Sequence, residues 1–207
     1  MYNHFLKRLI DIVLSLIGII ALAIPMIIVA VIIRAQDPGP ALFRQKRVGQ
    51  KKNGEITYFR LLKFRSMKMS APHDIPTHLL EDPEQYLLKC GKTIRKFSID
   101  ELPQLFNVLV GKMSIIGPRP ALFNQTDLIE EREKYGANNV RPGLTGWAQI
   151  NGRDELSIET KAALDGEYVE RLSFLFDCIC FFGTIGAVLR HDGVVEGAQQ
   201  ERKIIHK

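Results

Sequence analysis

The most apolar part of the chain is one run near its N-terminus, residues 12–33, which contains no charged residue. A helix needs about 20 apolar residues to cross the hydrocarbon core of a bilayer, so this run is long enough to do so. Its middle holds Pro25, which removes one helical hydrogen bond and crowds the preceding turn. The pattern predicts a membrane helix that breaks or kinks at residues 23–25.

Basic residues flank this run on both sides. Because cationic flanks favour the cytoplasmic side of a membrane, we expect both ends of the helix to lie on that side. Residues 1–36 are therefore predicted to form a re-entrant helix, which enters the membrane, breaks near Pro25 and leaves on the side it entered. A single span with a tolerated kink is the alternative, since prolines are common in such helices. The flanking cations are Lys7, Arg8, Arg34, Arg44, Lys46 and Arg47.

The rest of the chain, residues 37–207, alternates between short strand-like and helix-like segments. Residues 41–48 and 55–64 are β-rich, and the Asn53-Gly54 pair between them is a strong hairpin signal. The proline-containing stretch 70–83 is predicted to be a loop in which His73 and His78 are solvated. Helices are predicted at 84–96, from 98 or 100 to about 110, at 127–135 and at 160–171, with a short strand ending at residue 150. The pattern predicts an α+β fold, mostly helical, with one β-hairpin.

A second apolar segment covers residues 172–189 and is interrupted only by Asp177. It is marginally long for a membrane span, and an acid at its centre is costly there. We predict that a helix over about 167–190 lies in the membrane interface, with four phenylalanines directed towards the acyl chains. These are Phe174, Phe176, Phe181 and Phe182.

Composition points to an anionic partner. The 207 residues carry a formal net charge of +5 and 46% hydrophobic residues. That charge suits lipid headgroups or phosphates; nucleic acid is disfavoured, because no nucleic-acid-binding motif is recognisable. The three cysteines, Cys90, Cys178 and Cys180, fit no zinc spacing and indicate a reducing cytosol. The N-terminal run exceeds a usual signal peptide and lacks a small-residue cleavage site, so we expect it to persist in the mature protein.

The sharpest candidate for chemistry is the pair Asp100-Glu101, followed by Pro103. Proline is tolerated in the first turn of a helix, so either Ser98 or Asp100 is predicted to be the N-cap residue. Adjacent helical positions point about 100° apart, so one carboxylate can attack while the other binds a hard cation such as Mg²⁺. The alternative is that both acids only cap the helix.

Basic residues surround this pair in the sequence. Arg119 lies between two prolines and Arg141 precedes one, which fixes the backbone that presents each guanidinium. Arginine forks suit phosphate oxygens, although each cation alone is more simply a solvated surface charge. Trp147 is interpreted as a core residue, with base stacking as the alternative. The predicted substrate-binding residues are Lys63, Arg65, Arg95, Arg119 and Arg141, with weaker claims for Arg153, Asp154 and Asp165.

The motifs together resemble the monotopic phosphoglycosyl transferases, also called bacterial sugar transferases. They are residues 63–67 (KFRSM), 98–107 (SIDELPQLFN), 117–120 (GPRP), 141–147 (RPGLTGW) and 151–153 (NGR), and the resemblance runs from about residue 7 to 190. The length is similar to that of the minimal members, such as the bacillosamine-phosphate transferase. Some relatives have a serine before the membrane proline, where this chain has Ile24, so the sharpness of the break is less determined here.

The resemblance implies a re-entrant membrane helix and a catalytic domain, residues 37–207, on the cytoplasmic face of the bacterial inner membrane. It implies a UDP-sugar donor, a polyprenol (undecaprenyl) phosphate acceptor and Mg²⁺ as cofactor. Asp100 would be the nucleophile that forms an aspartyl-phosphosugar intermediate, and Glu101 the magnesium ligand. Arg95 and Arg119 would lie near the phosphates, and the reaction would be the first membrane step of glycoconjugate assembly.

Two other functions use the same residues. A membrane-bound phosphohydrolase would transfer the phosphosugar to water, and a non-catalytic scaffold would bind anionic lipid through its basic face. The sequence reports neither the sugar, nor the glycoconjugate pathway, nor the oligomeric state.

Overall fold

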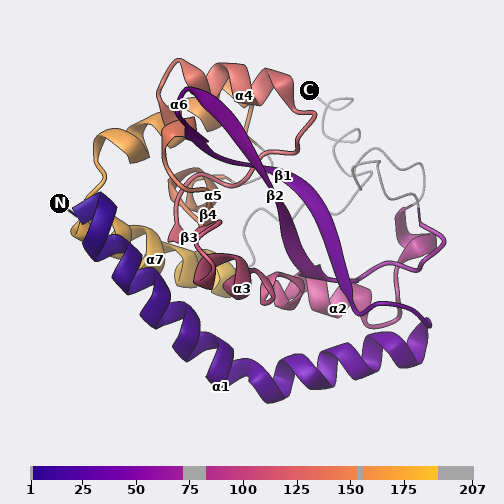
Figure 1. Cartoon of the computed structure of the whole chain (residues 1–207). Coiled ribbons are helices and arrows are strands. Elements are labelled where there is room, and N and C mark those ends of the chain that lie inside the picture. Colours follow the sequence, from indigo (N-terminus) through magenta and orange to yellow (C-terminus); the bar gives the residue numbers. More distant parts are fainter. Residues whose placement is uncertain (1, 72–82, 153–155, 191–207) are drawn as a thin grey trace.

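The computed structural model describes residues 2–71, 83–152 and 156–190. One long helix, α1 (Lys7–Gln36), follows a π-helical turn, Tyr2–Leu6. Pro25 lies inside α1, and Figure 1 shows the helix bending near its middle and running beneath the rest of the molecule. Only 11% of its most apolar window is buried, so α1 is not the core helix of a globular domain. It is long and apolar enough to cross a membrane.

Both halves of α1 are attached to the domain that follows. In the first half, Lys7 Nζ lies 2.5 Å from the carboxylate of Asp177, and Asp11 accepts hydrogen bonds from Ser114 Oγ at 3.0 Å and from the Ile115 amide at 2.9 Å. In the second half, Met26 and Ile33 are buried in a hydrophobic cluster with Phe64, Leu88 and Ile94. The exposed apolar side chains of α1 therefore lie on the side away from these contacts.

The predicted hairpin is confirmed. Strand β1 (Leu42–Lys52) pairs antiparallel with β2 (Glu55–Phe64). Asn53 and Gly54 form the turn with φ angles of 52° and 84°, which is the left-handed geometry that two-residue hairpin turns require. One face of the hairpin carries Phe59 and Leu61 into the core, and the same face carries Lys63.

A second, parallel sheet was not predicted. It pairs β3 (Ser114–Ile116) with β4 (Gly143–Thr145). Glycines let the two chains approach closely, because a Cβ on Gly143 would lie 2.2 Å from the Gly117 amide nitrogen. This sheet joins the two proline-containing motifs, so residues 117–120 start directly from β3. The predicted strand ending at residue 150 is wrong: Trp147–Ile150 is a short helix, α5.

The predicted helices over 127–135 and 160–171 correspond to α4 (Thr126–Glu133) and α6 (Ile158–Glu170). The predicted helix 84–96 is wrong as one element, because it divides into a 3₁₀ turn, Pro83–Tyr86, and α2 (Gly91–Lys96). The predicted helix from 98 or 100 to 110 divides into a 3₁₀ turn, Ile99–Glu101 (η4), and α3 (Gln104–Leu109). A further 3₁₀ turn, Ala137–Asn139, follows α4.

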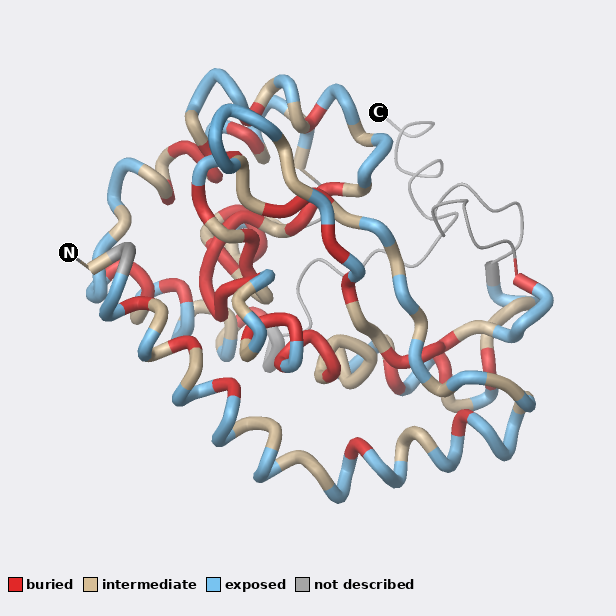
Figure 2. Tube along the Cα trace, viewed as in Figure 1, coloured by how far each residue is buried: buried red, intermediate tan, exposed pale blue. Residues whose placement is uncertain are grey.

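The core lies between the hairpin, α3, the second sheet and α7 (Phe174–Arg190), as the buried stretches in Figure 2 show. The predicted helix over about 167–190 is too long at its start, because residues 167–170 belong to α6 and α7 begins at Phe174; α7 packs on the domain. Phe174 and Phe182 are 55% and 67% exposed, as an interfacial helix requires, and Phe181 is 40% exposed. Phe176 is an exception to the prediction, because it is buried against Trp147 and Tyr168. The α+β prediction, with an apolar N-terminal helix and a hairpin, is confirmed.

Candidate active site

The acidic pair lies in a sharp turn between two short helices. Ser98 adopts a left-handed backbone conformation (φ 53°, ψ 25°), which reverses the chain after α2 and starts η4. Asp100 and Glu101 occupy η4, and the helix α3 begins only after Pro103. Neither predicted capping arrangement is present, since Ser98 makes no side-chain cap bond and Pro103 occupies the N-cap position of α3. The acids therefore lie in the turn that precedes the helix.

Two cations from separate elements contact this pair. Lys63 Nζ, on β2, lies 2.9 Å from Glu101 Oε1 and 3.6 Å from Asp100 Oδ2. Arg119 Nη2 lies 2.7 Å from the same Glu101 oxygen. The side chains of Asp100 and Glu101 are only 13% and 18% exposed, whereas that of Arg119 is 43% exposed. The structure thus brings together four residues from three segments that the sequence had suggested separately.

The two neighbouring carboxylates have opposite pKa shifts. Burial raises the pKa of Asp100, and the charges of Lys63 and Arg95 offset this only in part, while the adjacent Glu101 charge raises it further. Burial also acts to raise the pKa of Glu101, but the charges and hydrogen bonds of Arg119 and Lys63 outweigh it and hold that pKa below its usual range. Glu101 is therefore a fixed negative charge, and Asp100 is the acid whose protonation responds to its surroundings.

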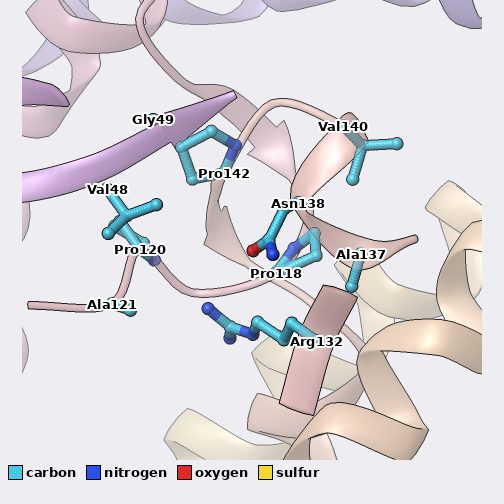
Figure 3. A pocket seen from close by; sticks show the side chains of 10 residues that line it. All are labelled: Val48, Gly49, Pro118, Pro120, Ala121, Arg132, Ala137, Asn138, Val140 and Pro142. Carbon is cyan, nitrogen blue, oxygen red and sulfur yellow. The ribbon is translucent and has the colours of Figure 1, made fainter. Parts of the chain in front are cut away.

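Strand β1 holds the loop that carries Arg119 through hydrogen bonds to the carbonyls that follow it. The guanidinium of Arg47 donates to the Pro120 carbonyl at 2.9 Å, and the Val48 amide donates to the Ala121 carbonyl at 3.0 Å. Figure 3 shows a small cavity on this side of the loop, with Arg132 extending into it from α4. The residues that line it are Val48, Gly49, Pro118, Pro120, Ala121, Arg132, Ala137, Asn138, Val140 and Pro142. None of these is a candidate acid, so the cavity supports the loop rather than forming the reaction site.

Arg95 approaches the pair from α2. Its Nε donates to Ser66 Oγ at 2.9 Å, and its charge acts on Asp100. The backbone carbonyl of Arg95 accepts the Ser98 amide at 3.0 Å, which ties α2 to the turn that carries the acids. The charge of Arg95 therefore acts on Asp100, and its predicted place near the donor phosphates stays a prediction.

Two other predicted substrate-binding residues, Arg65 and Asp165, form ion pairs elsewhere, and a third, Arg141, lies near another cation. Arg65 is buried and binds the carboxylate and carbonyl of Asp37 and the Pro40 carbonyl, so it joins the hairpin to the end of α1. Asp165 is fully buried on α6, where Arg132 binds it through Nε at 2.8 Å and Nη2 at 2.6 Å. Arg141 lies near Arg8, whose guanidinium binds the Val108 and Leu109 carbonyls. Arg153, Asp154, His73 and His78 lie outside the described residues.

The described residues contain no group of three or more His, Cys, Asp or Glu side chains that could hold a metal on their own. Mg²⁺ does not require one, because it is commonly bound through one or two carboxylates plus substrate phosphates. Glu101 suits this use: it is held ionised, and a carboxylate offers about four lone-pair sites, of which Lys63 and Arg119 take two on one oxygen. Glu101 therefore suits a magnesium ion whose other ligands would be oxygens of a substrate diphosphate.

Sequence reasoning missed the residue that links α3 to the hairpin. The side chain of Asn107 accepts the Leu62 amide at 2.9 Å and donates to the Arg60 carbonyl at 3.0 Å. It thereby fixes β2, and with it Lys63, against the helix that follows the acids. Its place in the 98–107 motif was the available signal. Trp147 packs against the core, as its first interpretation proposed, and its ring nitrogen donates to Glu167.

Comparison with known proteins identifies the family of the chain. The family model described as bacterial sugar transferase matches residues 2–191. The chain belongs to the bacterial sugar transferase family. Among curated relatives, an uncharacterised sugar transferase, EpsL of Bacillus subtilis, is 40% identical over 96% of this chain and 93% of its own length. This match spans nearly all of both proteins.

Two larger members of the family have more specific names. The undecaprenyl-phosphate galactose phosphotransferase of Salmonella typhimurium is 36% identical over 92% of this chain and 42% of its own length. The UDP-glucose:undecaprenyl-phosphate glucose-1-phosphate transferase of Escherichia coli is 37% identical over 88% of this chain and 40% of its own length. This sugar transferase therefore corresponds to less than half of each of these two relatives.

Proposed function

We propose that this sugar transferase moves a sugar 1-phosphate from a UDP-sugar to undecaprenyl phosphate, through a covalent intermediate on Asp100. The observation that carries the proposal is the asymmetry of the acidic pair. Glu101 is fixed by Lys63 at 2.9 Å and Arg119 at 2.7 Å, whereas the nearest of these cations to Asp100 is the shared Lys63, at 3.6 Å. The names of the larger relatives support the donor and acceptor classes.

In the first step, an Asp100 carboxylate oxygen attacks the phosphorus that bears the sugar. The new bond joins this oxygen to phosphorus, and the bond from phosphorus to the bridging oxygen of the diphosphate breaks, so UMP leaves. Arg119 and Arg95 offset negative charge on the phosphates during this transfer. In the second step, an oxygen of undecaprenyl phosphate attacks the same phosphorus and the aspartyl oxygen leaves. The product is an undecaprenyl diphosphate sugar, and the Asp100 carboxylate is restored.

Magnesium is part of the proposal, with Glu101 as its protein ligand and the donor diphosphate completing its coordination. When bound, Mg²⁺ would supply charge neutralisation at the diphosphate. The chain's own contribution is to keep Glu101 ionised by means of Lys63 and Arg119, and to limit access of water to a largely buried Asp100.

The membrane helix is proposed to re-enter rather than to span. A straight helix of 30 residues is about 45 Å long, longer than the roughly 30 Å of a bilayer's hydrocarbon core. A spanning helix would therefore place its two ends on opposite sides. Here Lys7 contacts Asp177 and the Asp37 that follows α1 contacts Arg65, so both ends bind the same domain. This favours a helix that bends at Pro25 within one leaflet, beneath a domain on the cytoplasmic face.

The proposal is tested by supplying a UDP-sugar and Mg²⁺ to purified protein without any acceptor. The expected result is release of UMP that stops near one equivalent per enzyme and resumes when undecaprenyl phosphate is added. Continuous UMP and sugar phosphate release without acceptor would identify a phosphohydrolase instead. Release that is absent with every UDP-sugar of a broad panel would support a non-catalytic lipid-binding scaffold.

A further inference from the structure

A short segment at the end of β2 contacts the candidate site at two places, an acid and a cation. Lys63 lies within it and binds Glu101 directly, at 2.9 Å. Ser66 lies three residues further on, and its hydroxyl accepts a hydrogen bond from Arg95 Nε at 2.9 Å. Ser66 itself is only 8% exposed, and its hydroxyl acts on the site through Arg95.

The backbone around Ser66 fixes the start of α2 in the same place. The Leu88 amide donates to the Ser66 carbonyl at 3.0 Å. A Cβ on Gly91 would lie 2.2 Å from that same carbonyl oxygen, so only glycine permits this close approach. Arg95 lies four residues after Gly91, about one helical turn later, which brings its side chain back above Ser66. Both the backbone and the hydroxyl of Ser66 therefore determine where Arg95 lies.

The position of Arg95 matters because it borders the acids. Its carbonyl accepts the Ser98 amide at 3.0 Å, and the left-handed Ser98 leads directly into Asp100. An arginine that is held through Nε keeps its two terminal nitrogens in a fixed plane, and this fork matches the oxygens of a phosphate. An arginine without that hold would lose more side-chain entropy on binding.

We propose that Ser66 is a positioning residue, whose hydroxyl orients the guanidinium of Arg95 towards the donor phosphate that faces Asp100. This inference rests on the proposed function and deepens it, because it assigns the orientation of one phosphate-binding group to a residue that does not touch the substrate. In this role Ser66 differs from Ser157, whose hydroxyl caps α6.

The test compares Ser66→Ala and Ser66→Thr with the wild-type protein in the acceptor-free UMP release assay. Ser66→Ala is expected to lower kcat/KM for the UDP-sugar about tenfold, because a hydrogen bond to a charged group is lost. Ser66→Thr keeps the hydroxyl and is expected to retain the wild-type kcat/KM. Ser157→Ala, a matched loss of a hydroxyl far from the acids in the sequence, is expected to change only stability.

A double-mutant cycle keeps the inference testable if Ser66→Ala folds poorly. In an Arg95→Ala background, Ser66→Ala should cause less than about a twofold further loss per folded enzyme, because the group it orients is already absent. An active wild-type protein whose kcat/KM is unchanged by Ser66→Ala, or an undiminished loss in the Arg95→Ala background, would overturn the role of Ser66. Failure of the proposed function gives a different result, in which the wild-type protein releases no UMP or Asp100→Asn remains active.

Discussion

Asp165 and Asp100 are both largely buried aspartates whose pKa is raised by burial, yet their surroundings differ. Arg132 binds Asp165 through two nitrogens, at 2.8 Å and 2.6 Å, and the Asp165 side chain is 1% exposed. Asp100 lies 3.6 Å from a lysine that binds its neighbour more closely, and its side chain is 13% exposed. A raised pKa alone therefore does not distinguish a structural acid from a reactive one. The distinction lies in whether the acid has its own cation and whether a substrate can reach it.

The largest expected effect is that of Asp100→Asn. The amide keeps the size of the side chain but is not a nucleophile, so UMP release should fall by about 1,000-fold or more. The free energy of unfolding should change by less than about 1 kcal/mol, since the ion pair that is lost, with Lys63 at 3.6 Å, is long and Lys63 keeps its closer pair with Glu101. Activity assays and urea denaturation of the same preparations measure both quantities. Normal UMP release by this variant would remove Asp100 from the mechanism.

Asp165→Asn should have the opposite profile. It leaves the buried Arg132 without its carboxylate, which is expected to lower the free energy of unfolding by about 3 kcal/mol or more. Activity per folded molecule should be retained. Glu84→Gln provides the control, because it breaks an exposed pair with Lys92 and should change stability by less than about 1 kcal/mol. A large loss of kcat by folded Asp165→Asn protein would place Asp165 in the active site after all.

The difference between the two carboxylates could be only partly predicted from the sequence. The motifs identified the acids, Lys63, Arg95 and Arg119, because these residue types suit phosphate chemistry. They also gave Arg65 as a substrate-binding residue, and Asp165 with a weaker claim, and the structure uses both in buried ion pairs. Pairing of charges that lie far apart in the sequence depends on tertiary contacts, such as those between Arg65 and Asp37 or between Arg132 and Asp165. No local pattern reports such contacts.

Elements with a strong local signal were predicted and those without one were not. Asn53-Gly54 fixed the hairpin through its turn geometry. The sheet of β3 and β4 has only three residues in each strand, too few to show alternation, and depends on contact between Gly117 and Gly143. The predicted helix across residues 98–110 divides at Leu102 and Pro103, because Pro103 has no amide hydrogen with which to continue the hydrogen bonds of η4.

The pH dependence of the first step distinguishes the acids further. Asp100 must be ionised to attack, and its pKa is raised by burial and by Glu101. On acidification, the rate of acceptor-free UMP release should therefore fall at a pH above about 4, which is the pKa of an ordinary aspartate. This fall is the acidic limb of the pH profile. Lys63→Gln should move this limb to still higher pH, because the lysine charge lowers the pKa of Asp100. Asp165→Asn should leave the limb unchanged. A pH profile with no acidic limb above about pH 4 would contradict the assignment.

The smallest expected effect concerns the strained turn beside Asp100. Ser98→Gly relieves the left-handed conformation but adds freedom to the unfolded chain, so it should raise the free energy of unfolding by about 0.5 kcal/mol. Ser98→Val should lower it by more than about 1 kcal/mol, because β-branched residues tolerate this conformation poorly. Asn53→Gly, in the hairpin turn, is the matched control with a similar φ angle. Thermal denaturation measures all three; equal stability of the glycine and valine variants would show that the turn is unstrained.

The central claim is that Asp100 carries the phosphosugar between donor and acceptor. Its most direct test is mass spectrometry of the protein after incubation with a UDP-sugar and Mg²⁺ but no undecaprenyl phosphate. The account predicts a mass increase equal to one sugar phosphate, located on the peptide that contains Asp100 and removed when the acceptor is added. An adduct on another residue, or UMP release coupled to product formation with no adduct at any time point, would contradict it.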